Sequence, residues 1–151
     1  MREVASAVSF SPIQHPITIH AIAPDATYAL RHAVLWPNQP AAYVQLPDDA
    51  AGQHFGALVG QEVVSVISLF ITGQEARFRK FATHPAWQGR GIGSALLVHT
   101  IAAARAAGAT SLWCDARQSA LPFYQRFGMQ PENPVFYKGT IPYQRLRLSL
   151  T

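Results

Sequence analysis

One stretch in the middle of the chain decides the fold, and it reads Phe81-Ala82-Thr83-His84-Pro85-Ala86-Trp87-Gln88-Gly89-Arg90-Gly91-Ile92-Gly93-Ser94. A strand pattern runs into a glycine-rich turn, and the turn opens a helix. Glycines let backbone N–H groups approach an anion closely. The helix N-terminus adds its dipole and its unpaired donors, and Arg90 adds a positive charge. The stretch therefore predicts a binding site for a pyrophosphate group.

Two other kinds of glycine-rich loop fit this stretch less well. A P-loop requires Gly-Lys followed by Ser or Thr, and the chain contains no such run. A dinucleotide fingerprint has the spacing Gly-x-Gly-x-x-Gly at the first strand, with an acidic ribose ligand further on. Here Gly89, Gly91 and Gly93 are more tightly spaced and lie mid-chain. A redox dinucleotide protein is the weaker alternative, and an ordinary glycine-rich turn stays open on the glycines alone.

Hydrophobic periodicity predicts the elements on either side of this stretch. Before it, the pattern predicts a strand over 17–23, a helix over 25–36, a loop over 37–51 and strands over 54–59, 62–71 and 75–83. After it, the pattern predicts a helix over 92–107, a strand over 111–116, a helix over 120–127 and strands over 134–138 and 143–150. Alternation in the strand over 75–83 places Ala76, Phe78 and Lys80 on one face. This order of elements predicts an α/β (α+β) sandwich built on a mixed sheet.

Composition indicates a small protein without a nucleic-acid or membrane partner. The chain has 151 residues, of which 49% are hydrophobic and 13% charged, and its net charge is +4. Lys and Arg are scattered and form no stripe, which argues against nucleic-acid binding. No apolar run approaches the roughly 20 residues of a membrane helix. We expect an N-terminal tail over 1–16, a single domain over 17–151 and a cytoplasmic location.

Cysteine usage limits the chemistry further. Cys114 is the single cysteine, so neither an internal disulfide nor the usual cysteine-rich zinc site can form. It lies in an apolar run, and no histidine–aspartate partnership is visible around it to support a covalent route. Cys114 is therefore expected to pack in the core, and no metal site is expected.

Three motifs in this order resemble those of the GNAT N-acetyltransferase superfamily. Gln88 to Gly93 resembles its Q/R-x-x-G-x-G/A signature, and Phe81 to Pro85 is similar to the strand end before that signature. Ala120 to Met129 resembles the later helix with the pattern A-x-x-F-Y-x-x-x-G-F. Gly139 to Tyr143 further resembles the ending of a small bacterial single-domain subgroup. The resemblance implies a mostly antiparallel sheet of six to seven strands, splayed between the fourth and fifth, with about four helices.

The resemblance also implies an activity. Members of this superfamily transfer an acetyl group from acetyl-CoA to an amine by direct transfer in a ternary complex, without a metal. The expected acceptor is a small-molecule or peptide amine, and a homodimer is one assembly that the family allows. The alternative is a module of the same fold that binds or senses acyl-CoA without turnover.

Site residues follow from the resemblance by position. The backbone of Phe81, Ala82 and Thr83 is expected to pair with the pantetheine arm of CoA as an added strand would. The pyrophosphate is expected on Gln88, Gly89, Arg90, Gly91, Ile92, Gly93 and Ser94. Tyr124 matches the tyrosine that gives a proton to the departing thiolate, and a phenol with a pKa near 10 suits a thiol with a pKa near 8.5. The other interpretation of Tyr124 is an aromatic core residue.

The general base stays open at this point. Asp115, at the end of the strand before the tyrosine helix, is the first candidate, Glu75 is the second, and a water chain without a dedicated base is the third. Arg117 stands where many members carry an asparagine that contacts CoA; it either contacts a CoA phosphate or is solvated. Four further residues are either structural or line the acceptor side: His20, Arg31, His32 and His54.

Overall fold

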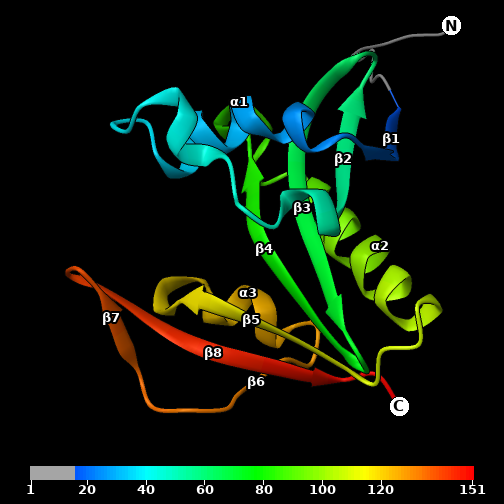
Figure 1. The fold of residues 1–151 in the computed structure, drawn as a ribbon, viewed down its shortest axis with the longest axis vertical. Helices are drawn as coiled ribbons and strands as arrows, with labels where there is room; N and C mark the ends of the chain where they lie inside the picture. The colour runs from blue at the N-terminus through cyan, green and yellow to red at the C-terminus, as the bar shows by residue number, and fades with distance from the viewer. Residues whose placement is uncertain (1–15) are drawn as a thin grey trace, which may run out of the picture.

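The computed structural model describes residues 16–151 (Figure 1). The predicted tail over 1–16 lies outside the described residues except for Pro16. The strands are β1 Ile17–Ile22, β2 Gln53–Val59, β3 Glu62–Thr72, β4 Glu75–Thr83, β5 Ser111–Arg117, β6 Gln130–Pro131, β7 Phe136–Lys138 and β8 Ile141–Ser149. The two longer α-helical segments are α2 Ile92–Ala106 and α3 Leu121–Gln125. Shorter helical turns are η1 Pro24–Thr27, α1 Tyr28–Leu30, η2 Arg31–Leu35, η3 Ala41–Val44, η4 Asp49–Ala51, η5 Pro85–Trp87 and η6 Gln118–Ala120.

The strands form one sheet in the order β1-β2-β3-β4-β5-β8-β6, with β7 paired to β8. All neighbouring pairs are antiparallel except β4 and β5, which run parallel. The predicted mixed, mostly antiparallel sheet is therefore confirmed. It has eight strands where six to seven were expected, because the two residues of β6 pair briefly with β8.

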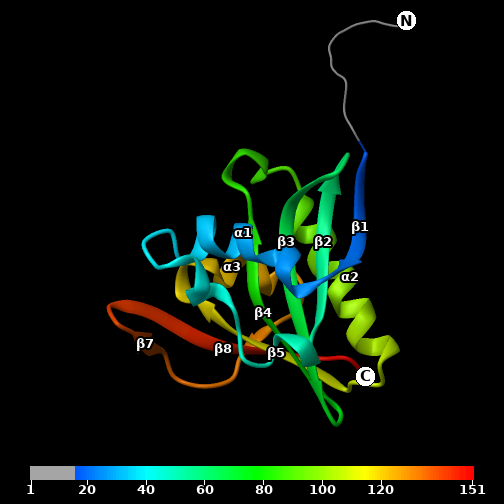
Figure 2. The same ribbon diagram turned by 45° about the horizontal axis from the view of Figure 1, so that its top comes forward.

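The sheet splits where β4 and β5 meet. Their pairing covers only three positions, from Glu75↔Ser111 to Arg77↔Trp113. Figures 1 and 2 show β5 and β8 leaving this point at a steep angle to β1, β2, β3 and β4. The predicted splay between the fourth and fifth strands is confirmed. The rest of β4, from Phe78 onward, therefore has no strand partner on its β5 side among the described residues.

A bulge at Lys80 interrupts β4. The pairing with β3 shifts register between Ser68 and Val66, and Lys80 has a φ of 55°, in the left-handed region that non-glycine residues rarely adopt. The extra residue changes which side chains share a face: Phe78 and Phe81 both pack on the main core, although they are three residues apart. The prediction that Lys80 shares the face of Phe78 is therefore wrong, and its amine lies 4.3 Å from the centre of the Trp36 ring on the opposite face.

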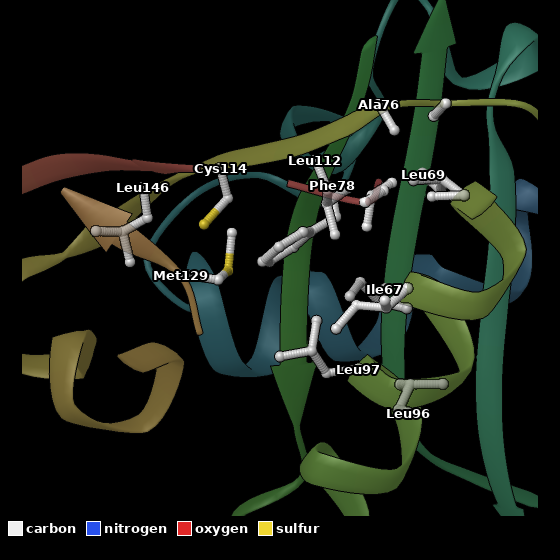
Figure 3. Close-up of a cluster of buried hydrophobic side chains, with 14 of the residues drawn as sticks. Ile67, Leu69, Ala76, Phe78, Leu96, Leu97, Leu112, Cys114, Met129 and Leu146 are labelled. Carbon is white, nitrogen blue, oxygen red and sulfur yellow. The ribbon is translucent and has the colours of Figure 1, made fainter. Parts of the chain in front are cut away.

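The main core lies between α2 and one face of the sheet. Figure 3 shows Leu97 of α2 pointing toward Ile67 of β3 and Phe78 of β4, and it shows Cys114 and Leu146 of β5 and β8 on the other side of Phe78. Burying a side chain of this kind stabilises the fold by about 1.5–3 kcal/mol. The two halves of the split sheet are thus joined by a continuous apolar core, and Cys114 is buried in it as expected.

The helix predicted over 25–36 forms as three successive turns of different pitch, η1, α1 and η2. It ends at Trp36, whose backbone is no longer helical, because Pro37 disfavours helical geometry in the residue before it. The predicted loop over 37–51 contains the single turns η3 and η4. Leu30 packs this segment on Val66 and Ala82, on the face of the sheet opposite α2.

A buried ionic network anchors this segment to the sheet. Arg31, fully buried, donates hydrogen bonds to both carboxylate oxygens of Asp49 at 2.9 Å, to the Ser68 hydroxyl and to the Val44 carbonyl. His54 contacts the same hydroxyl and the Asp49 carbonyl oxygen at 2.7 and 2.8 Å. Arg31 and His54, two of the residues considered for the acceptor side, are therefore structural.

Replacing Asp49 tests this network. We expect Asp49→Ala to lower the free energy of unfolding by about 3–5 kcal/mol, because it leaves the Arg31 charge buried without a partner. The neighbouring Asp48 pairs with Arg79 at 3.2 Å with its side chain 52% exposed, so Asp48→Ala is the matched control and should cost about 0–1 kcal/mol. Urea unfolding measures both, and equal losses would contradict the assignment.

The same pair predicts a dependence on pH. Burial alone would raise the pKa of Asp49, but the hydrogen bonds from Arg31 and Leu46 and the charges of Arg31 and His54 outweigh it and lower the pKa below its ordinary 3.8. The contribution of Asp49 to stability is therefore complete above pH 3.8 and is lost as the pH falls through the lower folded value.

Candidate active site

The glycine-rich loop takes backbone conformations that its glycines make available. Gly89 and Gly91 have φ values of 74° and 79°, where a side chain costs about 1–2 kcal/mol. Gly91 immediately precedes α2, and no side chain caps the first turn of that helix. An α-helix leaves four backbone N–H groups without intrahelical partners at its start. The loop therefore presents open donors, with the positive end of the helix dipole behind them.

Side chains fix the loop to the end of β4. Gln88 donates a hydrogen bond from its amide nitrogen to the Thr83 carbonyl at 3.0 Å. Arg90 lies over the Trp87 ring, with its guanidinium carbon 4.8 Å from the ring centre. Gln88 thus holds the loop in place, and Arg90 is positioned beside the loop by an aromatic ring.

The loop borders a cavity of about 620 Å³, which we call the glycine-loop cavity. It gathers nine residues predicted for this site: Phe81, Ala82, Thr83, Gln88, Gly89, Gly91, Ile92, Gly93 and Ser94. Arg126, at the end of α3, lines it as well and is not among the predicted site residues. Arg90 and Arg117 are not among its lining residues. The unpaired part of β4 is therefore exposed to the same space as the helix start.

A second cavity of about 380 Å³ lies against the other residues of the split, and we call it the cationic cavity. Val34, Phe81 and Ala120 line both cavities. Its positively charged lining residues are Arg77, Arg79, Lys80, Arg117 and Lys138. Asp115 is its one acidic lining residue within the described chain. The two cavities thus adjoin beside Phe81 at the split between β4 and β5.

Tyr124 lines the cationic cavity from α3. Its ring packs against Phe78 and Phe123, with centroids 5.7 and 5.1 Å apart. Burial, and then the neighbouring Cys114, raise the pKa of the Tyr124 phenol, so that the hydroxyl keeps its proton at neutral pH. Within residues 16–151 this hydroxyl makes no hydrogen bond. The side chain is thus both a packing residue and a protonated group beside the cavity.

Comparison with known proteins identifies this arrangement. The model of the acetyltransferase (GNAT) family matches residues 18–129, from β1 to the end of the α3 region. This chain belongs to the GNAT family. The predictions of an N-acetyltransferase, of acetyl-CoA as co-substrate and of the fold are confirmed. The non-catalytic alternative finds no support in the same matches.

The matches to related proteins extend over almost the whole length of each relative. An uncharacterized N-acetyltransferase of Bacillus subtilis, YitI, is 25% identical over 147 residues, which are 88% of this chain and 99% of the relative. A candidate N-acetyltransferase from Lactobacillus plantarum superposes with a TM-score of 0.81 at 21% identity, covering 89% of this chain and 99% of the other. A GNAT acetyltransferase from Elizabethkingia anophelis, solved with acetyl-CoA bound, has a TM-score of 0.70 at 18% identity, covering 88% and 97%.

The position of Asp115 weighs against its predicted role as the base of this acetyltransferase. Arg145 donates to its two carboxylate oxygens at 2.8 and 3.1 Å, and Arg77 lies at 3.5 Å. Burial alone would raise the pKa of Asp115, but Arg145 and Arg77 outweigh it and hold the pKa below its ordinary value. A carboxylate held in this way is a weak proton acceptor. These ion pairs could not be predicted from the sequence pattern, because Arg145 comes from β8.

The remaining candidates lie as follows. Glu75 pairs with Arg147 at 3.1 Å and does not line the cationic cavity. Arg117 lines the cationic cavity and not the glycine-loop cavity, so its predicted contact with a CoA phosphate stays a prediction that its position does not favour. Burial, and then Asp115, raise the pKa of the Cys114 thiol to about 12, which removes the thiolate that a nucleophile needs.

Among residues 16–151, no three His, Cys, Asp or Glu side chains come together as metal ligands. None of the helices described is long and apolar enough to span a membrane.

Replacing Gly91 tests the glycine-loop cavity. We expect Gly91→Ala to raise the KM for acetyl-CoA about tenfold. A side chain makes the left-handed backbone at this position unfavourable, and a loss of about 1.4 kcal/mol of binding free energy corresponds to a factor of ten. Gly60→Ala, in the turn between β2 and β3, is the matched control. Gly60 also has a positive φ, of 61°, with nothing within 4 Å of an added Cβ. Steady-state kinetics should show an unchanged KM for that variant, and equal effects would refute the assignment.

Proposed function

We propose that this acetyltransferase moves the acetyl group of acetyl-CoA directly to a small-molecule amine at the split between β4 and β5. The observation that carries the proposal is the junction of the two cavities beside Phe81. One cavity has the helix start and the unpaired edge that a CoA molecule requires. The other gives a second molecule access to the same strand at Phe81. Direct transfer needs both molecules seated at once.

The glycine-loop cavity suits the two chemically different parts of CoA. The amide groups of pantetheine match the unpaired backbone of β4 around Ala82, as an added strand would. The pyrophosphate matches the open N–H groups of Gly91, Ile92 and Gly93 at the start of α2. Arg126 adds a positive charge within the cavity, and Arg90 adds another beside it. These assignments follow from shape, charge and the family.

The chemical step requires two proton movements. The amine nitrogen attacks the thioester carbonyl carbon, a C–N bond forms, and the C–S bond breaks. The departing thiolate takes a proton from the Tyr124 hydroxyl, and the new amide nitrogen loses one. Tyr124 is the donor in this proposal because it lines the cationic cavity at the split and its phenol carries a proton at neutral pH. The phenolate is reprotonated from solvent before the next turnover.

The second proton has no dedicated side chain in this proposal. Asp115 is held by two arginines, and Glu75 lies outside the cationic cavity. We therefore assign the amine proton to water, which was one of the three options that the sequence left open. A cytoplasmic location and a homodimer stay predictions.

Replacing Tyr124 tests the proposal. We expect Tyr124→Phe to lower kcat about a hundredfold, with the KM for acetyl-CoA nearly unchanged, because only the proton donor is lost. Tyr137→Phe removes a hydroxyl from an exposed side chain on β7 and is the matched control. Thiol release over a panel of amines measures both variants. Full activity of Tyr124→Phe would overturn the acid assignment.

Replacing Asp115 separates a base from a positioning residue. We expect Asp115→Asn to leave the neutral-pH limb of the kcat/KM profile in place, because the Asp115 pKa is already held below 3.8. The melting temperature should fall, since Arg145 and Arg77 lose their counter-charge. Asp48→Asn, which removes an exposed carboxylate paired with Arg79 alone, is the control for the loss of one carboxylate. Disappearance of the limb in Asp115→Asn alone would restore Asp115 as the base.

A further inference from the structure

Positive charge is concentrated in the cationic cavity well beyond the average of the chain. Five basic side chains line about 380 Å³, against one acidic side chain from the described residues. Asp115 is already engaged by Arg77 and Arg145, and Arg79 is paired with Asp48. The net excess of positive charge in the cavity therefore comes from the other three basic side chains: Lys80, Arg117 and Lys138.

These three side chains have no ion pair among residues 16–151. Aromatic rings hold two of them in place. The Lys80 amine lies 4.3 Å from the centre of the Trp36 ring, and the Lys138 amine lies 4.4 Å from that of Tyr143. Trp36 and Tyr143 also line the cavity. Two charges thus lie against aromatic rings at the cavity, and neither has a counter-ion among the described residues.

The like charges act on one another. Burial first, and then the charges of Arg79, Lys138, Arg31 and Arg77, lower the pKa of Lys80 to about 8. The bulge sets this side chain in place through a left-handed backbone that a lysine adopts at a cost. The fold therefore maintains an unfavourable charge cluster at a strained position, which a bound anion would relieve.

We propose that the cationic cavity selects acceptors that carry an anionic group, a carboxylate or a phosphate, in addition to the amine that is acetylated. The excess of Lys80, Arg117 and Lys138 binds that group, and the aromatic rings of Trp36 and Tyr143 enclose the body of the molecule. Arginine and lysine are the side chains that bind such anions in proteins. This inference rests on the proposed function, because it names the substrate class of the same site.

The phosphates of CoA are anions that could also bind basic side chains. The lining of the two cavities separates the groups available to CoA from those available to the acceptor. The start of α2 and Arg126 belong to the glycine-loop cavity, whereas Lys80, Arg117 and Lys138 line only the cationic cavity. The residues common to both are apolar: Val34, Phe81 and Ala120. Each cavity therefore has its own basic groups, as two separate anionic ligands require.

The same charges assist the reaction. An amine attacks only in its neutral form, and neighbouring positive charges lower the pKa of an ammonium group. Lys80 lies in the same surroundings, where burial first and then four neighbouring positive charges lower its pKa. An acceptor held by its anionic group would lose its ammonium proton more readily there, which accords with a cavity whose one described carboxylate, Asp115, is paired with arginines. Polycationic amines would be repelled.

A set of related amines tests the proposal on the full chain. Propylamine supplies the amine alone, β-alanine and γ-aminobutyrate add a carboxylate, phosphoethanolamine adds a phosphate, and putrescine adds a second cation. We expect kcat/KM by thiol release to be at least about tenfold higher for one anionic class than for propylamine, and lowest for putrescine. The advantage should shrink as sodium chloride is added, because salt screens exposed charges. Equal values, or a preference for putrescine, would overturn the proposal.

Variants locate the anion. Arg117→Gln and Lys138→Gln should each raise the KM for the preferred anionic acceptor about tenfold, with the KM for acetyl-CoA unchanged. Arg105→Gln, on the exposed end of α2 outside both cavities, is the matched loss of charge and should change neither. If Arg117→Gln and Lys138→Gln raise the KM for acetyl-CoA instead, the cations serve CoA and the proposal is overturned.

Binding distinguishes this proposal from the proposed function. The preferred anionic amine should raise the melting temperature of the wild-type protein, and Lys138→Gln should weaken that shift. A shift without turnover of any amine would support the anion site and refute the proposed function. Turnover of neutral amines with no shift and no anionic preference would refute the anion site alone.

Discussion

The site depends on one constraint, the early end of the parallel pairing between β4 and β5. Three paired positions hold the two halves of the sheet together near the start of both strands. Beyond Arg77 the strands diverge, and Phe123 and Tyr124 of α3 pack beside the gap against Phe81 and Phe78. A continuous ladder would satisfy the backbone of β4 and close both cavities. The split leaves that backbone open while the apolar core keeps the halves in fixed relation (Figure 3).

The bulge at Lys80 determines which side chains the open edge of β4 presents to each face of the sheet. Without the extra residue, strict alternation would turn Phe81 toward the face of η2 and Lys80 toward the core. With it, Phe81 joins the core beside Phe78, and Lys80 stays with Arg77 and Arg79 on the other side. One strand therefore presents a wall of apolar rings to α3 and a row of cations to the cationic cavity. The left-handed backbone of Lys80 is the cost of that change of face.

The parts of the site that the sequence could predict are local ones. The glycine loop and the start of α2 are specified within a few residues, and Tyr124 lies at a fixed place in a short motif. The ion pairs of Asp115 are not local, because Arg145 is 30 residues away and reaches it only through the pairing of β5 with β8. The bulge left a faint signal, since the apolar residues of β4 are spaced by two and then by three, at Ala76, Phe78 and Phe81.

The cationic cavity shows why overall charge is a poor guide to a site. A net charge of +4 with basic residues scattered along the sequence indicates only a mild excess of positive charge and does not predict a ligand. Folding brings Arg77 and Lys80 of β4 together with Arg117 of β5 and Lys138 of β7, four positions separated by up to 61 residues. The carboxylates that reach this region pair with arginines on its border, so the charges left over are those that face the cavity. Charge that remains unbalanced after folding therefore indicates what the acceptor must bring.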